Sequence, residues 1–156
     1  MNNRTFITLE EEIKQKRSFK NVHEKSLVNL LYTHNWVMEQ MRQFFGRYGL
    51  TLKQYNILRI LRGAKGPLST SQIRDRMLDK MSDTTRLIDR MVKKGWVEKN
   101  VCAHDRRLVD IVITDDGLSL LDLIQDMGQQ SEDIFKNLDI SEVEQLSYLL
   151  DKMRYR

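Results

Sequence analysis

Hydrogen-bonding and cationic residues are concentrated in one stretch in the middle of the chain. Small polar residues come first and basic residues follow: Ser82, Asp83, Thr84, Thr85, Arg86, Arg90, Lys93 and Lys94. Short hydroxyl side chains can hydrogen-bond to the edges of nucleic-acid bases, and arginine or lysine can bind guanine or phosphate oxygens. This stretch is therefore a candidate surface for reading DNA, with Lys93, Lys94 and the earlier Ser69 as candidate contacts to the DNA backbone.

A second cluster of charged residues, Asp105, Arg106 and Arg107, lies between two runs that are rich in β-branched residues. The runs cover residues 96–101 and 108–114, and apolar side chains recur at every other position of the second run. This pattern predicts a β-hairpin with a cationic tip. Such a tip could enter the minor groove of DNA, where narrow A·T-rich stretches concentrate negative potential.

The charge of the chain is unevenly distributed. The formal net charge is only +4 over 156 residues, but residues 51–107 have 14 basic and 6 acidic side chains, a balance of +8. Residues 1–50 have 8 and 5, a balance of +3, and residues 108–156 have 4 and 11, a balance of −7. The cationic segment holds both clusters, which points to a polyanionic partner, and the acidic segment would face away from phosphate.

Helices are predicted around both clusters. Apolar residues at three- and four-residue steps indicate helices over 23–48, from residue 52 to the 63–67 stretch, over 69–78 and from about 82 to 95, and the same periodicity returns after residue 114. In a capping box of this kind, a serine or threonine hydroxyl and a glutamate or glutamine side chain three residues later satisfy the first N–H groups of a helix. The chain has four such patterns: Thr8 with Glu11, Thr51 with Gln54, Ser69 with Gln72, and Ser141 with Glu144.

Three consecutive helices followed by a basic hairpin predict a mainly α (α+β) fold, a winged helix-turn-helix with a two-stranded β wing and dimerisation helices near both ends. The helix that begins near Ser82 would fit the ~12 Å major groove of B-DNA.

Several segments, taken in order, resemble the MarR family of bacterial transcriptional regulators. They are 49–58, 85–91, 95–99 and 105–107 followed by 113–117. The resemblance implies a homodimeric winged-helix regulator, most often a repressor, that binds a pseudo-palindromic operator in double-stranded DNA and is often released by a small phenolic or other aromatic effector. It also implies that residues 82–86 begin the recognition helix, that Asp105 braces the wing and that Arg107 enters the minor groove. The chain departs from the family at Lys99, where an arginine is common.

The expected organisation is an N-terminal helical extension, residues 1–22, followed by a single MarR-type domain, residues 23–156. Residues 50–114 would form the winged DNA-binding part, and residues 23–49 and 115–156 the dimerisation helices, which carry more apolar surface than the winged part can cover. A second copy is expected to cover the stripe of Leu146, Leu149, Leu150 and Met153. A helix over 9–19 in the extension would either pack on the partner subunit or be mobile.

Individual residues have competing interpretations. His34, close to Tyr32 and Trp36, is a candidate for lining an effector pocket, although a hydrogen-bonded core or interface position is the alternative. Cys102 is a candidate redox-sensing thiol because cations surround it in the sequence, but an unreactive thiol is the simpler interpretation. The scattered histidines and the single cysteine predict no metal site, and no cofactor is expected beyond an effector.

Several functional classes are not expected. The chain has no apolar run close to the ~18 residues of a membrane-spanning helix and no apolar core of a signal peptide, which predicts a cytoplasmic protein without a membrane partner. It also lacks a glycine-rich phosphate loop and common hydrolase motifs, so no enzyme is expected. The alternatives to a ligand-responsive repressor are a winged-helix module that binds an acidic protein, and a DNA-binding regulator that is constitutive or controlled by oxidation.

Overall fold

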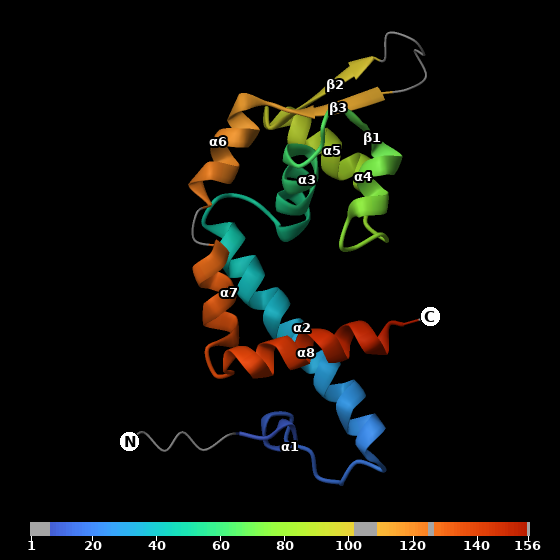
Figure 1. Cartoon of the computed structure of the whole chain (residues 1–156), viewed down its shortest axis with the longest axis vertical. Coiled ribbons are helices and arrows are strands. Elements are labelled where there is room, and N and C mark those ends of the chain that lie inside the picture. The colour runs from blue at the N-terminus through green and yellow to red at the C-terminus, as the bar shows by residue number, and fades with distance from the viewer. Residues whose placement is uncertain (1–6, 102–108, 125–126, 156) are drawn as a thin grey trace. The chain divides into compact units, whose positions relative to one another are not determined.

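The computed structural model describes residues 7–101, 109–124 and 127–155 (Figure 1). The chain divides into two compact units, Met1–Gln40 and Met41–Arg156. The helix α2 (Val22–Gly46) belongs in part to each of them.

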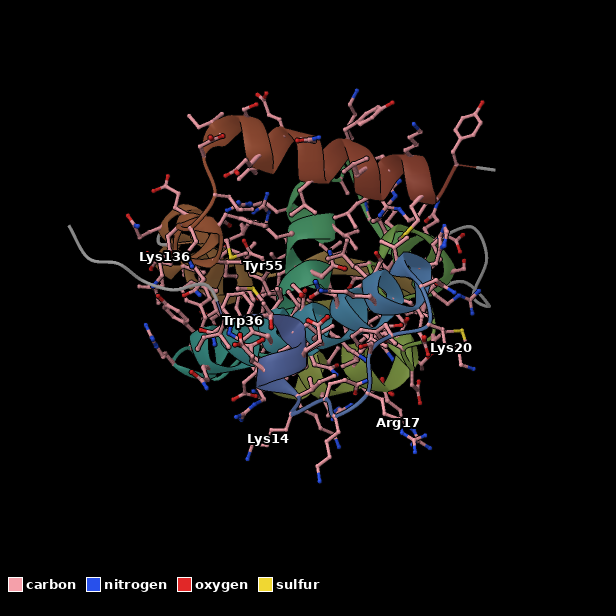
Figure 2. All side chains as sticks on the ribbon, turned by 90° about the horizontal axis from the view of Figure 1, so that it is seen from below. Lys14, Arg17, Lys20, Trp36, Tyr55 and Lys136 are labelled. Atoms are coloured by element: carbon pink, nitrogen blue, oxygen red, sulfur yellow. The ribbon has the colours of Figure 1, made fainter. Side chains whose placement is uncertain are left out.

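The described part of the first unit contains a short helix, α1 (Leu9–Glu12), and the start of α2. Thr8 and Glu11 form the predicted capping box, but α1 ends at Glu12, with Ile13 as its C-cap, and Lys14 has a φ of 53°. The prediction of a helix over 9–19 was therefore wrong. In a longer helix Glu10 would lie four residues before Lys14, but such pairs stabilise an isolated helix by only about 0.2–0.5 kcal/mol. In the structure Glu10 pairs with Lys25 of α2, at 2.7 Å between Oε1 and Nζ. Figure 2 shows Lys14 pointing outward from this segment.

Three helices follow in the second unit: α3 (Leu52–Arg62), α4 (Thr70–Arg76) and α5 (Thr84–Lys93). The predicted capping boxes at Thr51 and Ser69 are confirmed, with Gln54 and Gln72 as their partners. These hydroxyl and amide side chains satisfy backbone N–H groups that would otherwise lack an intrahelical acceptor. The sequence thus determines where α3 and α4 begin.

Within the described residues, the sheet has three strands in the order β1-β3-β2, and both neighbouring pairs are antiparallel. The strands β2 (Val97–Val101) and β3 (Val109–Ile113) form the predicted wing, with Val97 opposite Ile113. The third strand, β1 (Leu68–Ser69), was not predicted, because two residues are too short for an alternating pattern. It places Leu68 opposite Ile111 and so attaches the start of α4 to the wing.

The core of the second unit draws on all of these elements. Its fully buried side chains are Phe45, Ile57, Leu58, Ile73, Ile88, Met91, Val97 and Ile111. They come from the end of α2, from α3, α4 and α5, and from both long strands. Because α5 contributes two of them, its apolar face is fixed against the core and its opposite face remains outside.

Three helices follow the wing: α6 (Asp115–Leu123), α7 (Met127–Phe135) and α8 (Ile140–Met153). The predicted capping box of Ser141 and Glu144 was wrong, because Asp139 and Glu142 form it instead and Ser141 lies inside α8. Both pairs have the same spacing, and the pair that comes first in the chain begins the helix. The described residues of α7 and α8 include no buried side chain.

Candidate nucleic-acid interface

Helix α5 has one buried face and one exposed cationic face. Its buried residues, Thr84, Leu87, Ile88 and Met91, follow the three- and four-residue steps of a helix. The exposed residues are Thr85, Arg86, Asp89, Arg90 and Lys93. The exposed side thus holds a hydroxyl group and three cations along ten residues of helix.

The start of α5 is set by Asp83, which is the N-cap and not a free carboxylate. Its Oδ1 accepts a hydrogen bond from the backbone N–H of Arg86 at 3.1 Å. Its Oδ2 lies 3.1 Å from Nε of the same arginine, whose side chain is 82% exposed. The helix was predicted to begin near Ser82 and begins two residues later. Asp83 therefore orients Arg86, the cation nearest the helix start.

Two of the three hydroxyl residues predicted to read bases are engaged within the protein. Thr84 is only 4% exposed, and its Oγ1 donates to the carbonyl of Ser82 at 3.3 Å and lies 3.4 Å from Sδ of Met77. Ser82 donates through Oγ to Asp79 at 2.8 Å. Thr84 lies on the helix face of Ile88 and is covered by the core. Thr85 is thus the predicted hydroxyl residue that the structure leaves on the exposed face.

The three candidates for backbone contacts also differ. Lys93 is exposed at the end of α5. Lys94 has partners within the protein: its Nζ donates to the carbonyl of Gly49 at 2.9 Å and lies 4.1 Å from the ring centroid of Trp96. Ser69 accepts a hydrogen bond from the N–H of Gln72 at 3.3 Å as the N-cap of α4. Lys94 and Ser69 therefore have structural roles that the sequence did not indicate.

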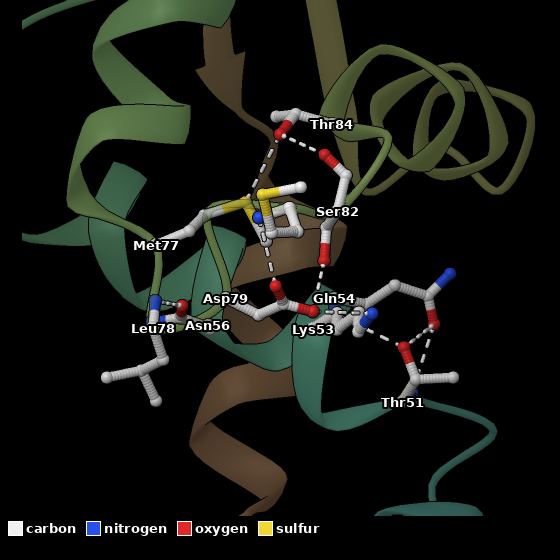
Figure 3. Close-up of polar contacts among 10 residues, drawn as sticks. Thr51, Lys53, Gln54, Asn56, Met77, Leu78, Asp79, Ser82 and Thr84 are labelled. Atoms are coloured by element: carbon white, nitrogen blue, oxygen red, sulfur yellow. Dashed lines mark hydrogen bonds and ion pairs between the residues drawn. The ribbon is translucent and has the colours of Figure 1, made fainter.

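The turn between α4 and α5 is organised by Asp79, which was not predicted from the sequence (Figure 3). Its carboxylate accepts hydrogen bonds from Ser82 Oγ at 2.8 Å and from the N–H of Met81 at 3.0 Å. Nζ of Lys53, on α3, lies 2.8 Å from Oδ2. The bond from Lys53, followed by those from Ser82 and Met81, lowers the pKa of Asp79 to about 2. An aspartate three residues before a serine was the available sequence signal, but the contact from Lys53 depends on tertiary structure.

The wing begins beside α5. Lys99, on β2, forms an ion pair with Asp89 of α5, so that the first strand of the wing is attached to the exposed side of the helix. The predicted tip residues Asp105, Arg106 and Arg107 lie outside the described residues, as does Cys102.

Comparison with known proteins identifies this arrangement. A model of the MarR family matches residues 48–108. The transcriptional regulator PecS of Dickeya dadantii is 30% identical over 112 residues, which cover 70% of this chain and 68% of PecS. The chain belongs to the MarR family of transcriptional regulators.

Two solved structures are similar to this chain. A MarR transcription factor from Planctomyces limnophilus is 32% identical, with a TM-score of 0.67, over 86% of this chain and 98% of that one. A mutant of Escherichia coli MarR, crystallised with operator DNA, has a TM-score of 0.74 at 22% identity, over 96% of this chain and 100% of that one. The second structure shows the same fold.

The other residues singled out in this MarR-family chain lie outside the winged part. His34 is exposed on α2, as are Tyr32 and Trp36. On α8, Leu146, Leu149 and Met153 are exposed by 37%, 49% and 62%, and Leu150 is half-buried. An apolar groove of about 560 Å³ lies between α7 and α8.

The described residues of this MarR-family chain contain no group of three His, Cys, Asp or Glu side chains that could hold a metal ion. They also contain no helix that is long and apolar enough to cross a membrane.

Proposed function

We propose that this regulator is a homodimeric, non-enzymatic repressor that acts in the cytoplasm on a pseudo-palindromic DNA operator. Helix α5 would lie in the major groove and the wing in the adjacent minor groove. The observation that carries the proposal is the exposed face of α5, where Thr85, Arg86, Arg90 and Lys93 lie opposite the core-facing residues. In a helix-turn-helix, the residues at the start of the second helix contact base edges, so Thr85 and Arg86 are the candidates for base contacts.

The remaining cations would contact phosphates. Arg90 and Lys93 lie further along the same face, and the segment 51–107 has a balance of +8. Arg106 and Arg107 are assigned to the wing tip from the sequence, with Asp105 as their brace. Phosphate contacts of this kind position a protein on DNA without specifying sequence.

The dimer is supported by the exposed apolar side chains of α8. Leu146, Leu149 and Met153 recur at steps of three and four residues on a helix that buries none of its own residues. Apolar stripes of this kind on soluble proteins mark protein interfaces. Two-fold symmetry would then present two copies of α5 to half-sites about 34 Å apart or a multiple of that distance.

An aromatic effector is proposed as the signal that releases DNA. His34 is exposed on α2 and lies two positions in the sequence from each of two exposed aromatic residues, Tyr32 and Trp36. A thermal-shift screen of phenolic acids, followed by His34→Ala for each compound that binds, tests this assignment. A control substitution on the same helix is Thr33→Ala. Equal effector affinity in the two variants would remove His34 from the pocket.

The DNA-binding proposal is tested by selecting duplexes from a random pool with the full-length protein, followed by footprinting on the DNA upstream of its own gene. We expect enrichment of an inverted repeat and protection of the same sequence. An absence of enrichment, together with binding to an acidic protein, would instead support the protein-interaction module. Treatment of the protein with peroxide before footprinting tests the oxidation-controlled alternative: loss of protection only in protein that retains Cys102 would support it.

A further inference from the structure

The turn between α4 and α5 is attached to α3 by two contacts from one side of that helix. Lys53 Nζ lies 2.8 Å from Asp79 Oδ2. Three residues along, Asn56 Oδ1 accepts a hydrogen bond from the N–H of Leu78 at 3.0 Å. Because residues three apart are neighbours on a helix surface, the two contacts hold consecutive residues of the turn against the same side of α3. Figure 3 shows both contacts.

Asp79 also connects the turn to the start of α5. The same Oδ2 that faces Lys53 accepts the hydrogen bond from Ser82 Oγ at 2.8 Å, and Oδ1 accepts from the N–H of Met81 at 3.0 Å. The carbonyl of Ser82 in turn accepts from the N–H of Thr84 at 2.8 Å. A continuous path of polar contacts therefore joins α3 to the first turn of α5. The path uses no residue from the exposed face of α5.

We propose that Lys53, Asp79 and Ser82 are positioning residues, which fix the direction in which α5 leaves the turn and so determine discrimination between operator and non-specific DNA. This inference rests on the proposed binding of DNA by α5. Hydrogen bonds to base edges need their donors placed to within about 0.5 Å. Attraction to phosphates depends only weakly on such displacements, because Coulomb energy falls slowly with distance. Release of α5 from the turn should therefore weaken specific binding far more than non-specific binding.

The direction in which Asp79→Asn changes the affinity for DNA distinguishes a positioning role from a purely electrostatic one. Asp79→Asn removes a negative charge from the winged part, which by itself would strengthen binding to every DNA. A positioning role predicts instead that Asp79→Asn weakens binding to the operator sequence. Asp75→Asn is the matched control, since it removes one carboxylate from α4 at a residue for which the described part of the chain shows no hydrogen bond or ion pair.

The experiment measures the affinity of full-length wild type, Asp79→Asn, Lys53→Met and Asp75→Asn by fluorescence anisotropy. The probes are the duplex that wild type selects from a random pool and a scrambled duplex of the same composition. We expect the ratio of the two affinities to fall roughly tenfold in Asp79→Asn and Lys53→Met, and not in Asp75→Asn. The double variant Lys53→Met/Asp79→Asn should lose no more than the worse single variant, and Lys53→Arg should retain the wild-type ratio.

Three results would overturn the inference. The first is an equal ratio in Asp79→Asn and Asp75→Asn. The second is a loss in Lys53→Met that is equal on both duplexes and accompanied by a salt slope smaller by about 1, which would make Lys53 a phosphate contact. The third is a double variant whose loss is the sum of the two single losses. If circular dichroism shows that Asp79→Asn is unfolded, the inference is tested by the affinity ratios of Lys53→Met and Lys53→Arg. Failure of wild type to prefer any duplex would overturn the proposed function itself.

Discussion

Arg86 is held by a local contact with Asp83 and is also the arginine proposed to contact a DNA base. Its side chain is exposed in the first turn of α5, and the carboxylate of Asp83 pairs with its Nε. A planar guanidinium can donate two parallel hydrogen bonds to guanine. An arginine oriented before binding loses less conformational freedom on contact.

Arg86→Ala should therefore weaken specific binding by about 1–3 kcal/mol and relax the preference at one base pair. Arg154→Ala is the control, because Arg154 forms the same kind of exposed ion pair, with Asp151 three residues earlier, in the acidic part of the chain. The measurement is an anisotropy titration against every single-base variant of the selected duplex. An equal loss on all duplexes would reassign Arg86 to phosphate binding.

Asp79 gives the turn a defined dependence on pH. The pKa of Asp79 is lowered from 3.8 to about 2, chiefly by Lys53, so the folded protein binds the proton less tightly than the unfolded chain. The stabilisation from the ionised carboxylate is thus complete above about pH 5, shrinks below the unfolded pKa of 3.8 and is lost as the pH falls through 2. Urea denaturation of wild type and Asp79→Asn from pH 7 to pH 2 should show a wild-type advantage that is constant to about pH 5 and then shrinks. An advantage that grows toward low pH would contradict the ion pair.

The elements α5, β2 and α6 meet at Gly117, which has the closest neighbours of the described glycines. A Cβ on Gly117 would lie 2.2 Å from the carbonyl oxygen of Trp96 and 2.9 Å from Cγ1 of Ile113. Thr114, the N-cap of α6, donates through Oγ1 to the carbonyl of Gly95 at 2.6 Å and accepts from the N–H of Gly117 at 3.1 Å. The first turn of α6 is thus held directly against the backbone that follows α5.

Gly117→Ala should destabilise the fold by about 1–3 kcal/mol, because the obstructing atom belongs to the backbone and cannot rotate away. Gly128→Ala is the matched control: Gly128 also lies in the first turn of a helix, and a Cβ there would meet nothing within 4 Å. Differential scanning calorimetry should show a lower Tm for Gly117→Ala and an unchanged or raised Tm for Gly128→Ala. Similar melting temperatures for the two variants would contradict the packing.

Contacts between residues close together in the chain could be predicted from the sequence, whereas contacts between distant residues could not. The capping boxes of Thr51 and Ser69 could be predicted because both partners lie within three residues. The hydrogen bond that Lys94 donates within the protein could not be predicted, because its acceptor, the carbonyl of Gly49, is 45 residues away in the chain. The burial of Thr84 could have been predicted, since Thr84 precedes Leu87, Ile88 and Met91 by three, four and seven residues, which places all four on one face of a helix.

For the whole molecule, the charge balance of +8 falls on residues 51–107, which include α3, α4, α5 and the first strand of the wing, and the balance of −7 falls on residues 108–156, which include α6, α7 and α8. The winged fold and the MarR family were predicted from the order of elements and the motifs, and both are confirmed. The interface residues stay a prediction, because the proposed contacts of Leu149 would be made to a second chain.

Leu149→Asp should convert the proposed dimer to a monomer, because it places a charge among apolar side chains that a second copy would cover. Leu123→Asp is the control, since Leu123 is an exposed leucine of α6 outside the proposed stripe. Sedimentation velocity at micromolar concentration should show a monomer for the first variant and a dimer for the second. A dimer in both variants would place the interface elsewhere.

Ser69 belongs both to β1 and to the cap of α4, so a single residue fixes a strand register and a helix start. A residue inserted after it would break the cap and shift the chain against the wing. The preceding residues 65–67 are exposed, and a Cβ at Gly66 would meet nothing within 4 Å. Because doubling the length of a flexible loop costs only about 0.6 kcal/mol, an epitope tag or a fluorescent reporter inserted there should leave both helices of the helix-turn-helix in register.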